Sequence, residues 1–209
     1  MNSLLTLNKE KLDVINFMEC AENLLCTDLS PHQRRILLVY IQHATLEIAG
    51  RWEEIFDPRL TVERPNYIFA APKKLYKLDS LDAVKWFYNS LSTAGSSVRL
   101  LKNEEIYLTD KGFMSEAKYQ IYMRGDTARL YGHDVKDDDG FYIESRWSIV
   151  NWQFDERARM IGERVYPAPT ADIQKIDKNA YWETAEVAEI MTERIDKGWK
   201  LLMDLDLTP

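Results

Sequence analysis

The chain has 209 residues, of which 45% are hydrophobic and 29% are charged, a composition typical of one globular domain rather than of a disordered chain. Its formal net charge is −7 and it has no dense stripe of lysine and arginine, which argues against a nucleic-acid partner. No apolar run approaches the roughly 18 residues that a membrane-spanning helix needs, so we expect no membrane partner.

The N-terminal stretch, residues 1–13, has no basic flank and no small-residue cleavage site, so it does not resemble a signal peptide and a cytoplasmic location is expected. Cys20 and Cys26 fall six residues apart in one predicted helix, where their side chains diverge. We therefore expect free thiols rather than a disulfide or a metal pair. The three histidines have no zinc-site spacing and there is no glycine-rich phosphate loop. These features predict no metal and no cofactor.

Hydrophobic spacing predicts three helices in the first half of the chain, over residues 8–26, 30–50 and 79–95. The second has the clearest start. Ser30 suits the N-cap, Pro31 the first helical position, and Gln33 completes a capping box. The third is expected to begin with Asp79 as its N-cap. These signals place the helices before any long strand.

The second half of the chain is predicted to form strands, over residues 98–108, 113–123, 130–135, 141–154 and 160–166. Turns are expected at 137–140 and 155–158, and connections this short favour antiparallel hairpins. A last helix is predicted at about 178–203, packing outside the sheet or against another subunit. Helices followed by antiparallel strands indicate the α+β class.

Three stretches resemble the nuclear transport factor 2-like superfamily, which includes the SnoaL-like proteins. Residues 47–65, EIAGRWEEIFDPRLTVERP, resemble its opening, in which a helix ends at a small residue and a tryptophan-containing segment leads into a strand. Residues 81–88, LDAVKWFY, are similar to its next helix, and Phe154–Asp155 with Met160–Glu163 resemble its final hairpin. The resemblance spans residues 31–166 and supports a fold more than an activity.

The resemblance implies a single domain over 1–209, in which a curved antiparallel sheet and N-terminal helices form a cone around one small-molecule pocket. The cone would span 30–168, with helical extensions at 1–29 and 169–209. Members of the superfamily include ketosteroid isomerase, scytalone dehydratase, polyketide cyclases, limonene epoxide hydrolase and a cofactor-free diarylpropane lyase that releases formaldehyde. It also implies a homo-oligomer, a dimer or a trimer.

Candidate catalytic residues lie on the 30–50 helix. His43 and Glu47 are four residues apart on one helical stripe, so the carboxylate can orient the imidazole. Tyr40 extends the same stripe toward the substrate. The alternative is a surface pair at the edge of an amphipathic helix. The Tyr-Asp pair of scytalone dehydratase is not reproduced here, since Glu47-Ile48 stands in its place.

The strands supply the other candidates. Tyr119 belongs to the more apolar face of 113–123 and is expected to point inward as a proton donor, with a core tyrosine as the alternative. In 141–154 both faces are half apolar. Hydrophobicity favours Trp147 and a catalytic Asn151 inside, whereas alignment with ketosteroid isomerase favours Arg146; Trp152 is a further binding candidate. Tyr67 is expected to follow the first strand and close the mouth of the cone.

These residues predict a cofactor-independent lyase, dehydratase or isomerase that uses acid–base chemistry on a hydrophobic, aromatic small molecule such as a phenolic lignin dimer, with formaldehyde release as one outcome. The first alternative is a non-catalytic binding or assembly module of the same fold. It would be favoured by a pocket filled with tryptophan and phenylalanine and lacking a buried polar cluster. The second alternative is the structural small subunit of a ring-hydroxylating dioxygenase.

Overall fold

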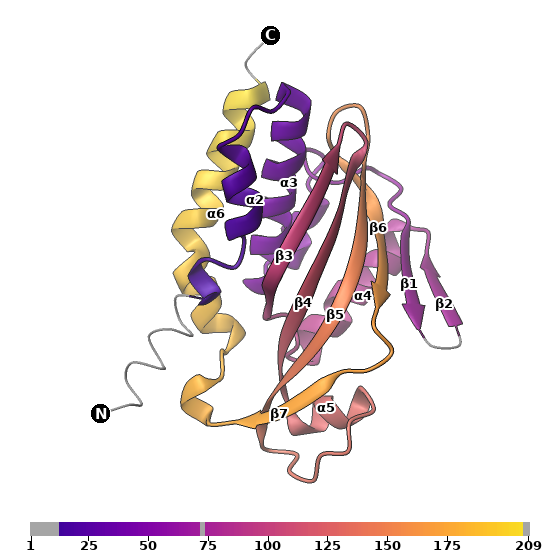
Figure 1. Cartoon of the computed structure of the whole chain (residues 1–209), viewed down its shortest axis with the longest axis vertical. Coiled ribbons are helices and arrows are strands. Elements are labelled where there is room, and N and C mark those ends of the chain that lie inside the picture. Colours follow the sequence, from indigo (N-terminus) through magenta and orange to yellow (C-terminus); the bar gives the residue numbers. More distant parts are fainter. Residues whose placement is uncertain (1–12, 72–73, 207–209) are drawn as a thin grey trace.

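The computed structural model describes residues 13–71 and 74–206 and has the predicted α+β architecture. A curved, open sheet lies beside a layer of helices, and the N- and C-terminal helices pack side by side (Figure 1). In the described ranges the main elements are α2 (Glu19–Leu25), α3 (Pro31–Ile48), β1 (Tyr67–Ala71), β2 (Lys74–Leu78), α4 (Leu81–Thr93), β3 (Arg99–Thr109), β4 (Gly112–Arg124), α5 (Gly125–Leu130), β5 (Phe141–Phe154), β6 (Met160–Pro167), β7 (Asp172–Ile176) and α6 (Thr184–Asp206). Short 3₁₀ helices lie at Trp52–Phe56 and Lys178–Ala180.

The sheet of the described chain has seven strands in the order β2-β1-β6-β5-β4-β3, with β7 pairing to β5 beyond the end of β6. All pairs are antiparallel except β1 with β6, which is parallel. The predicted curved antiparallel sheet is confirmed, with the parallel β1–β6 pair as its exception. This exception arises because α4 and the long β3–β5 meander separate β1 from β6 in sequence, so no hairpin joins them.

The helix α3 begins and ends close to the predicted positions. The Ser30 side chain accepts a hydrogen bond from the backbone N–H of Gln33, and the Gln33 side chain accepts one from the backbone N–H of Ser30. This confirms the capping box. The helix buries both of its long faces, since it lies between the sheet and the C-terminal helix, and ten of its residues are buried. It is the central element of the helical layer.

Some predicted elements were wrong. Residues 130–135 form no strand; instead α5 ends at Leu130, because the chain turns back at Gly125 to bond Gly140. The N-cap of α4 is Ser80 rather than Asp79, since the Ser80 hydroxyl accepts from the N–H of Ala83. The strands β2 and β7 were missed, because their mostly exposed residues show no alternation. The predicted 8–26 helix is interrupted at 16–18, and residues 8–12 lie outside the described chain.

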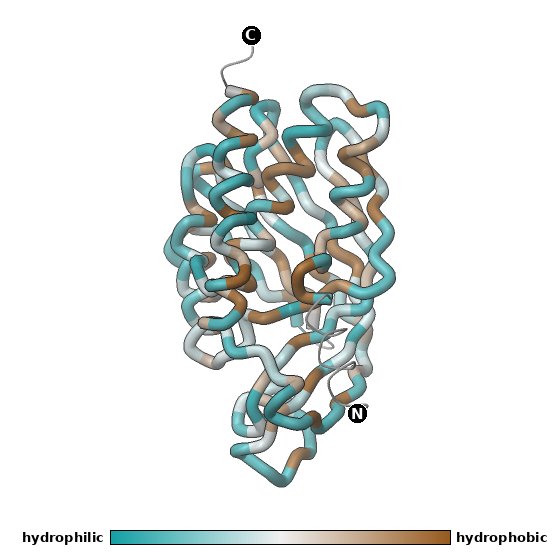
Figure 2. Tube along the Cα trace, turned by 90° about the vertical axis from the view of Figure 1, so that its left-hand side faces the viewer, coloured by the Kyte–Doolittle hydropathy of each residue, from teal (hydrophilic) through white to brown (hydrophobic). Residues whose placement is uncertain are grey.

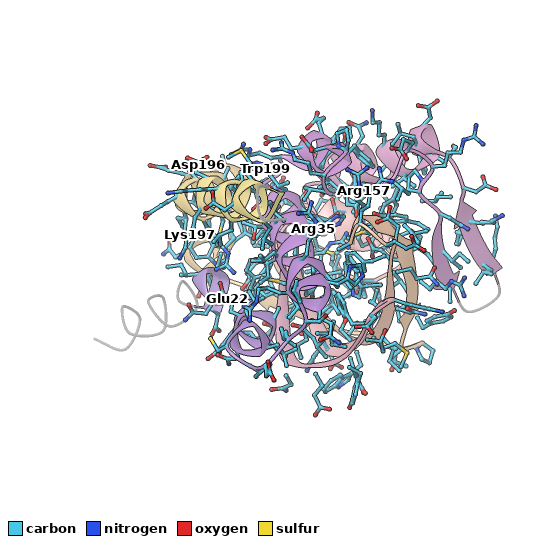
Figure 3. The ribbon with its side chains drawn as sticks, turned by 90° about the horizontal axis from the view of Figure 1, so that it is seen from above. Glu22, Arg35, Arg157, Asp196, Lys197 and Trp199 are labelled. Atoms are coloured by element: carbon cyan, nitrogen blue, oxygen red, sulfur yellow. The ribbon has the colours of Figure 1, made fainter. Side chains whose placement is uncertain are left out.

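The C-terminal helix α6 packs against the outer side of α3, not on the sheet. Gly198 makes this close approach possible, because a Cβ at that position would lie 1.9 Å from Oε1 of Gln42. The buried Gln42 amide donates to the backbone carbonyl of Ile195 at 3.2 Å. Figure 3 shows Trp199 on the same helix, and the Arg59 guanidinium lies 4.5 Å from its ring centroid.

The larger of two apolar clusters fills the space between the concave face of the sheet and the helices, and a smaller one lies around Met123, Ala128 and Tyr142 near α5. Apolar and polar positions alternate along the helices turned to the viewer in Figure 2, as expected for elements that bury one face. At the far end of the cone, Arg35 of α3 donates to the carbonyl of Arg157 in the β5–β6 turn at 3.1 Å (Figure 3). The helical and sheet layers are thus joined at this end by a direct hydrogen bond.

Within residues 13–71 and 74–206, no helix combines the length and apolar character that crossing a bilayer requires. The same residues contain no group of three or more histidine, cysteine, aspartate or glutamate side chains placed to hold a metal ion.

Candidate active site

The pairing register shows which strand residues face the helices. Phe113 of β4 lies opposite Trp152 of β5, which lies opposite Glu163 of β6. Directly paired residues share a face of the sheet, and all three side chains are buried. Tyr119 lies on this face of β4, three alternate positions along from Phe113. The inner face therefore carries the predicted Tyr119 and Trp152.

Two predicted residues lie on the outer face of the sheet. Trp147 is 44% exposed there, and Asn151 shares its side of β5. The assignment of both to the pocket was wrong, because apolar residues such as Ile149 also occupy the outer face and hydrophobicity could not separate the two sides. Arg146 lies on the inner side, but its guanidinium donates to Glu144 at 2.9 Å and to the carbonyl of Ala168 at 3.3 Å.

A buried hydrogen-bonded chain joins α3, α4 and β6. His43 is fully buried, and its Nε2 lies 2.9 Å from the hydroxyl of Tyr88. The Tyr88 hydroxyl donates to Oε1 of Glu163 at 3.0 Å. The other imidazole nitrogen, Nδ1, is buried without a hydrogen-bond partner among the described residues. An imidazole, a phenol and a carboxyl are thus linked in the interior, where protons can pass between them.

A second carboxylate lies beside this chain. Oε2 of Glu47 is 4.0 Å from Nε2 of His43, and Oε1 of Glu47 is 3.6 Å from Nη1 of Arg99. The side chains of Glu47 and Arg99 are 16% and 21% exposed, so they form the solvent side of the cluster. The predicted His43–Glu47 pair therefore exists, but Arg99 from β3 is the closer partner of the carboxylate.

Burial sets the protonation states of this cluster. Desolvation, with the Glu47 charge adding to it, raises the pKa of Glu163 to about 8. Desolvation also lowers the pKa of His43 to about 3, so the imidazole is neutral at pH 7. The pKa of Glu47 is raised by burial, and the Arg99 charge partly offsets this shift. Near neutral pH the cluster therefore holds a neutral base and a carboxyl that is readily protonated.

A further carboxyl reaches the interior from β3. The Tyr40 hydroxyl donates to Oε1 of Glu104 at 2.7 Å, and burial raises the pKa of Glu104 to about 7. Burial also raises the pKa of Tyr119 above its usual range, with the charges of Glu104 and Glu163 adding to the effect. Tyr119 is consequently a neutral phenol that can donate a hydrogen bond.

Aromatic rings line the interior around these polar groups. Tyr40 packs edge-on against Phe113, with ring centroids 4.7 Å apart, and lies 4.9 Å from Trp152. Tyr67 does not follow the first strand or close the mouth of the cone; it begins β1 and is fully buried, and its hydroxyl donates to Sδ of Met160 at 3.2 Å. The error arose because the first strand begins later than expected, at Tyr67 itself.

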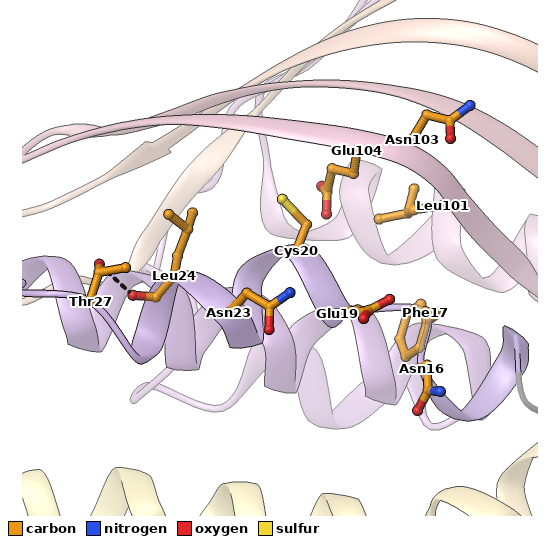
Figure 4. A pocket seen from close by; sticks show the side chains of 10 residues that line it. All are labelled: Asn16, Phe17, Glu19, Cys20, Asn23, Leu24, Thr27, Leu101, Asn103 and Glu104. Atoms are coloured by element: carbon orange, nitrogen blue, oxygen red, sulfur yellow. Dashed lines mark hydrogen bonds between the residues drawn. The ribbon is translucent and has the colours of Figure 1, made fainter.

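The clefts at the surface of the described residues include the following two. One, of about 560 Å³, lies between α2 and β3 and includes Cys20 and Glu104 (Figure 4). The other, of about 660 Å³, lies beside the β4–β5 end of the cone and includes His32 and Asp110. Neither is lined by His43, Tyr88 or Glu163. The buried cluster meets solvent through the partly exposed Glu47 and Arg99.

Sequence patterns missed Tyr88, Arg99, Glu104 and Glu163 as site residues. Tyr88 belongs to the predicted 79–95 helix, in which no site residue was proposed. Glu163 belongs to a strand whose partner, the 141–154 strand, had no assigned inner face. Trp152 and Glu163 pair directly in the β5–β6 hairpin, so an assignment of Trp152 to the inner face of the sheet would also have placed Glu163 on that face.

The raised pKa of Glu163 predicts a stability effect. A carboxyl with a higher pKa in the folded than in the unfolded protein binds more protons when folded, so stability falls as pH rises from about 4.5 to about 8. Glu163→Gln cannot ionise. Between those pH values, we expect the free energy of unfolding of the wild-type protein to fall by on the order of 3 kcal/mol more than that of the variant.

Urea unfolding curves of both proteins at several pH values measure this difference. Glu116→Gln, on the exposed side of β4, is the control and should parallel wild type. Identical pH dependence in Glu163→Gln and wild type would show that Glu163 is not held protonated in the folded state.

The architecture and this interior define the fold. An open, curved sheet with helices on its concave side encloses a polar cluster in an aromatic wall, which is the cone of nuclear transport factor 2-like and SnoaL-like proteins. No family model matches the sequence, and no curated protein matches it significantly.

One solved structure supports this fold assignment, and two others are reported beside it. A putative SnoaL-like polyketide cyclase from Jannaschia sp. CCS1 is similar at a TM-score of 0.50 and 10% identity, over 68% of this chain and 90% of that one. Bal32a from a soil-derived mobile gene cassette has a TM-score of 0.48 and 9% sequence identity, over 65% of this chain and 91% of that one. SalBIII, an epoxide hydrolase/cyclase-like enzyme with a role in pyran ring formation in salinomycin, has a TM-score of 0.45 and 12% sequence identity, over 69% of this chain and 95% of that one. At 10% identity the likeness to the Jannaschia protein shows the fold alone.

Proposed function

We propose that this protein is a cofactor-independent enzyme, a lyase, dehydratase or isomerase, that moves protons on a small, hydrophobic, aromatic molecule. The observation that carries the proposal is the buried chain of His43, Tyr88 and Glu163 inside the cone. A non-catalytic binding module needs only apolar walls, whereas a buried polar cluster with shifted pKa values is costly to fold and typical of acid–base catalysis.

The residues have distinct roles in this proposal. Glu163 acts as the base and removes a proton from the substrate, because its raised pKa makes the carboxylate a stronger base than an exposed glutamate. Tyr119 donates a hydrogen bond to the oxygen on which negative charge develops. Tyr88 and His43 position Glu163 through their hydrogen bonds, and Glu47 with Arg99 completes the charged side of the cluster.

The specific form of the proposal is a phenolic 1,2-diarylpropane-1,3-diol as substrate. Loss of water from the first carbon converts the phenol to a quinone methide. Removal of the proton from the terminal hydroxyl then breaks the carbon–carbon bond, releases formaldehyde, and returns the electron pair to the ring as a phenolate stilbene. The aromatic wall of Tyr40, Phe113 and Trp152 supports an aryl substrate. A colorimetric formaldehyde assay tests this form, and absence of formaldehyde would restrict the proposal to the general reaction.

The general reaction is tested with 5-nitrobenzisoxazole, a flat aromatic probe that opens to a coloured phenolate when one carbon-bound proton is removed. We expect wild type to accelerate this opening, and His43→Ala and Tyr119→Phe to lower kcat/KM at least about tenfold each. His32→Ala, at a half-buried residue outside the His43 chain, and Tyr107→Phe, at an exposed residue, serve as controls. The site assignment is wrong if both interior variants retain wild-type turnover.

We also propose that the protein is a homo-oligomer that associates through the outer face of its sheet. That face exposes large apolar side chains from four adjacent strands, namely Tyr107, Met114, Trp147, Ile149 and Tyr166. Trp147→Glu should shift the molecular mass measured by light scattering toward that of one chain. Leu130→Glu, at an exposed site on α5, should not. A wild-type protein that is already monomeric would contradict the proposal.

A further inference from the structure

The cleft between α2 and β3 is separate from the His43 chain and has its own polar group. Figure 4 shows Cys20 from α2 and Glu104 from β3 directed toward one another across it, with Leu101 beside Glu104. Its lining residues are Asn16, Phe17, Glu19, Cys20, Asn23, Leu24, Thr27, Leu101, Asn103 and Glu104. Its volume of about 560 Å³ falls within the range of small-molecule sites.

A β-bulge directs Glu104 into this cleft. The β3–β4 register shifts between Lys102 and Glu105, and Asn103 takes a φ of +52° within the shift. The extra residue lets Glu104 point toward α2 and α3 instead of continuing the alternation of the strand. A bulge with a left-handed non-glycine residue costs free energy, so the placement of this one carboxyl is a specific feature of the strand.

Only one of the two carboxyl oxygens of Glu104 has a hydrogen-bond partner among the described residues. Oε1 accepts from the Tyr40 hydroxyl at 2.7 Å, whereas Oε2 is buried and has no hydrogen-bond partner among the described residues. A buried acceptor without a partner costs about 1–3 kcal/mol, more if charged, so a donor that reached Oε2 from the cleft would be stabilised. The cleft therefore contains an acceptor without a donor.

We propose that this cleft binds a small molecule with an apolar body and a protonated amine, and that the amine donates to Oε2 of Glu104. Phe17, Leu24 and Leu101 provide the apolar surface, and Glu19 adds a second carboxylate. No lysine or arginine lines the cleft in the described chain, and the nearby Lys102 is paired with Asp13 at 2.5 Å. This charge balance favours a cation over a neutral or anionic ligand.

Backbone-amide NMR titration at pH 8 with 2-phenylethylamine, against the matched neutral 2-phenylethanol, tests the proposal. We expect the amine to shift amides in 16–27 and 101–104 and to bind about tenfold more tightly than the alcohol. Glu104→Gln should reduce this preference to about twofold or less. Glu105→Gln, the adjacent exposed carboxylate, should keep it.

Equal affinity for amine and alcohol, a preference that survives Glu104→Gln, an equal loss in Glu105→Gln, or shifts confined to other residues would each overturn the proposal. So would the absence of any shift up to the solubility limit of the amine. The titration measures binding at the α2–β3 cleft, so its outcome does not depend on whether the protein catalyses a reaction at Glu163.

Acidification provides a second measurement. Glu104 is faced by Tyr40 from α3, Cys20 from α2 and Tyr119 from β4, with the Glu19 and Glu105 carboxylates close by. Burial raises the pKa of the Cys20 thiol to about 11 and of both phenols above their usual range, so these groups stay neutral near pH 7. Amine affinity should fall about tenfold from about pH 8 to about pH 6 as Glu104 gains a proton. A flat profile would contradict the role of Glu104.

Discussion

Glu163→Gln is expected to lower kcat/KM for carbon-proton removal by roughly 100-fold or more, because an amide cannot accept the proton that the carboxylate takes. In wild type the rate should rise about tenfold per pH unit up to about pH 8 and then level off, since the base works only when ionised and burial raises the pKa of Glu163 to about 8. The pH–rate profile with 5-nitrobenzisoxazole measures both effects. The variant should lose this rise along with the rate.

The controls separate a chemical role from a structural one. Glutamine keeps the size of the side chain and an oxygen that can accept from the Tyr88 hydroxyl, so the fold should persist, as circular dichroism would show. Glu116→Gln removes a carboxylate from the exposed face of β4 and should retain the wild-type rate and profile. A normal rate in Glu163→Gln, or a wild-type profile that falls toward pH 8, would rule out Glu163 as the base.

Gly162→Ala is expected to destabilise the protein by roughly 3 kcal/mol, a large effect for the addition of one methyl group. Gly162 has a φ of +157°, and a Cβ there would lie 2.1 Å from the backbone carbonyl oxygen of Asn66. Neither group can move without shifting a strand segment. Because Glu163 is the next residue along β6, the same shift should also displace the carboxyl from Tyr88 and lower activity.

Gly132→Ala is the matched comparison for this change. Gly132 also has a positive φ, +93°, but no atom lies within 4 Å of the position of an added Cβ. Gly132→Ala should therefore lower the free energy of unfolding by roughly 1 kcal/mol, because alanine disfavours a positive φ. Thermal unfolding measures both variants. Equal losses in the two would mean that the contact with Asn66 does not constrain β6.

Local signals in the sequence were sufficient for the elements that depend on local physics. The α3 helix was predicted from Ser30, Pro31 and Gln33, whose contacts all lie within one helical turn. The β5 strand was predicted at its observed bounds, 141–154. His43 is buried and Tyr119 lies on the inner face of β4, as helical and strand periodicity predicted, whereas Glu47 lies at the partly exposed edge.

The partners of these residues depend on distant contacts. Tyr88 lies 45 residues from His43 and 75 from Glu163 in the sequence, and periodicity within one element cannot pair them. Glu104 is placed by a bulge that breaks the alternation of β3, so its strand pattern was ambiguous. The inner face of β5 was also ambiguous, because exposed apolar residues such as Trp147 made the outer face resemble the core.

The contact between Gln42 and Ile195 has a consequence for the order in which the protein can mature. These residues are 153 positions apart, and α3, which carries His43, is made long before the helix that supports its outer side. During synthesis α3 is therefore left with one uncovered apolar side until α6 leaves the ribosome. A ribosome stalled before α6 should expose a helix that a chaperone can bind, and proton-transfer activity should appear only after α6 has docked.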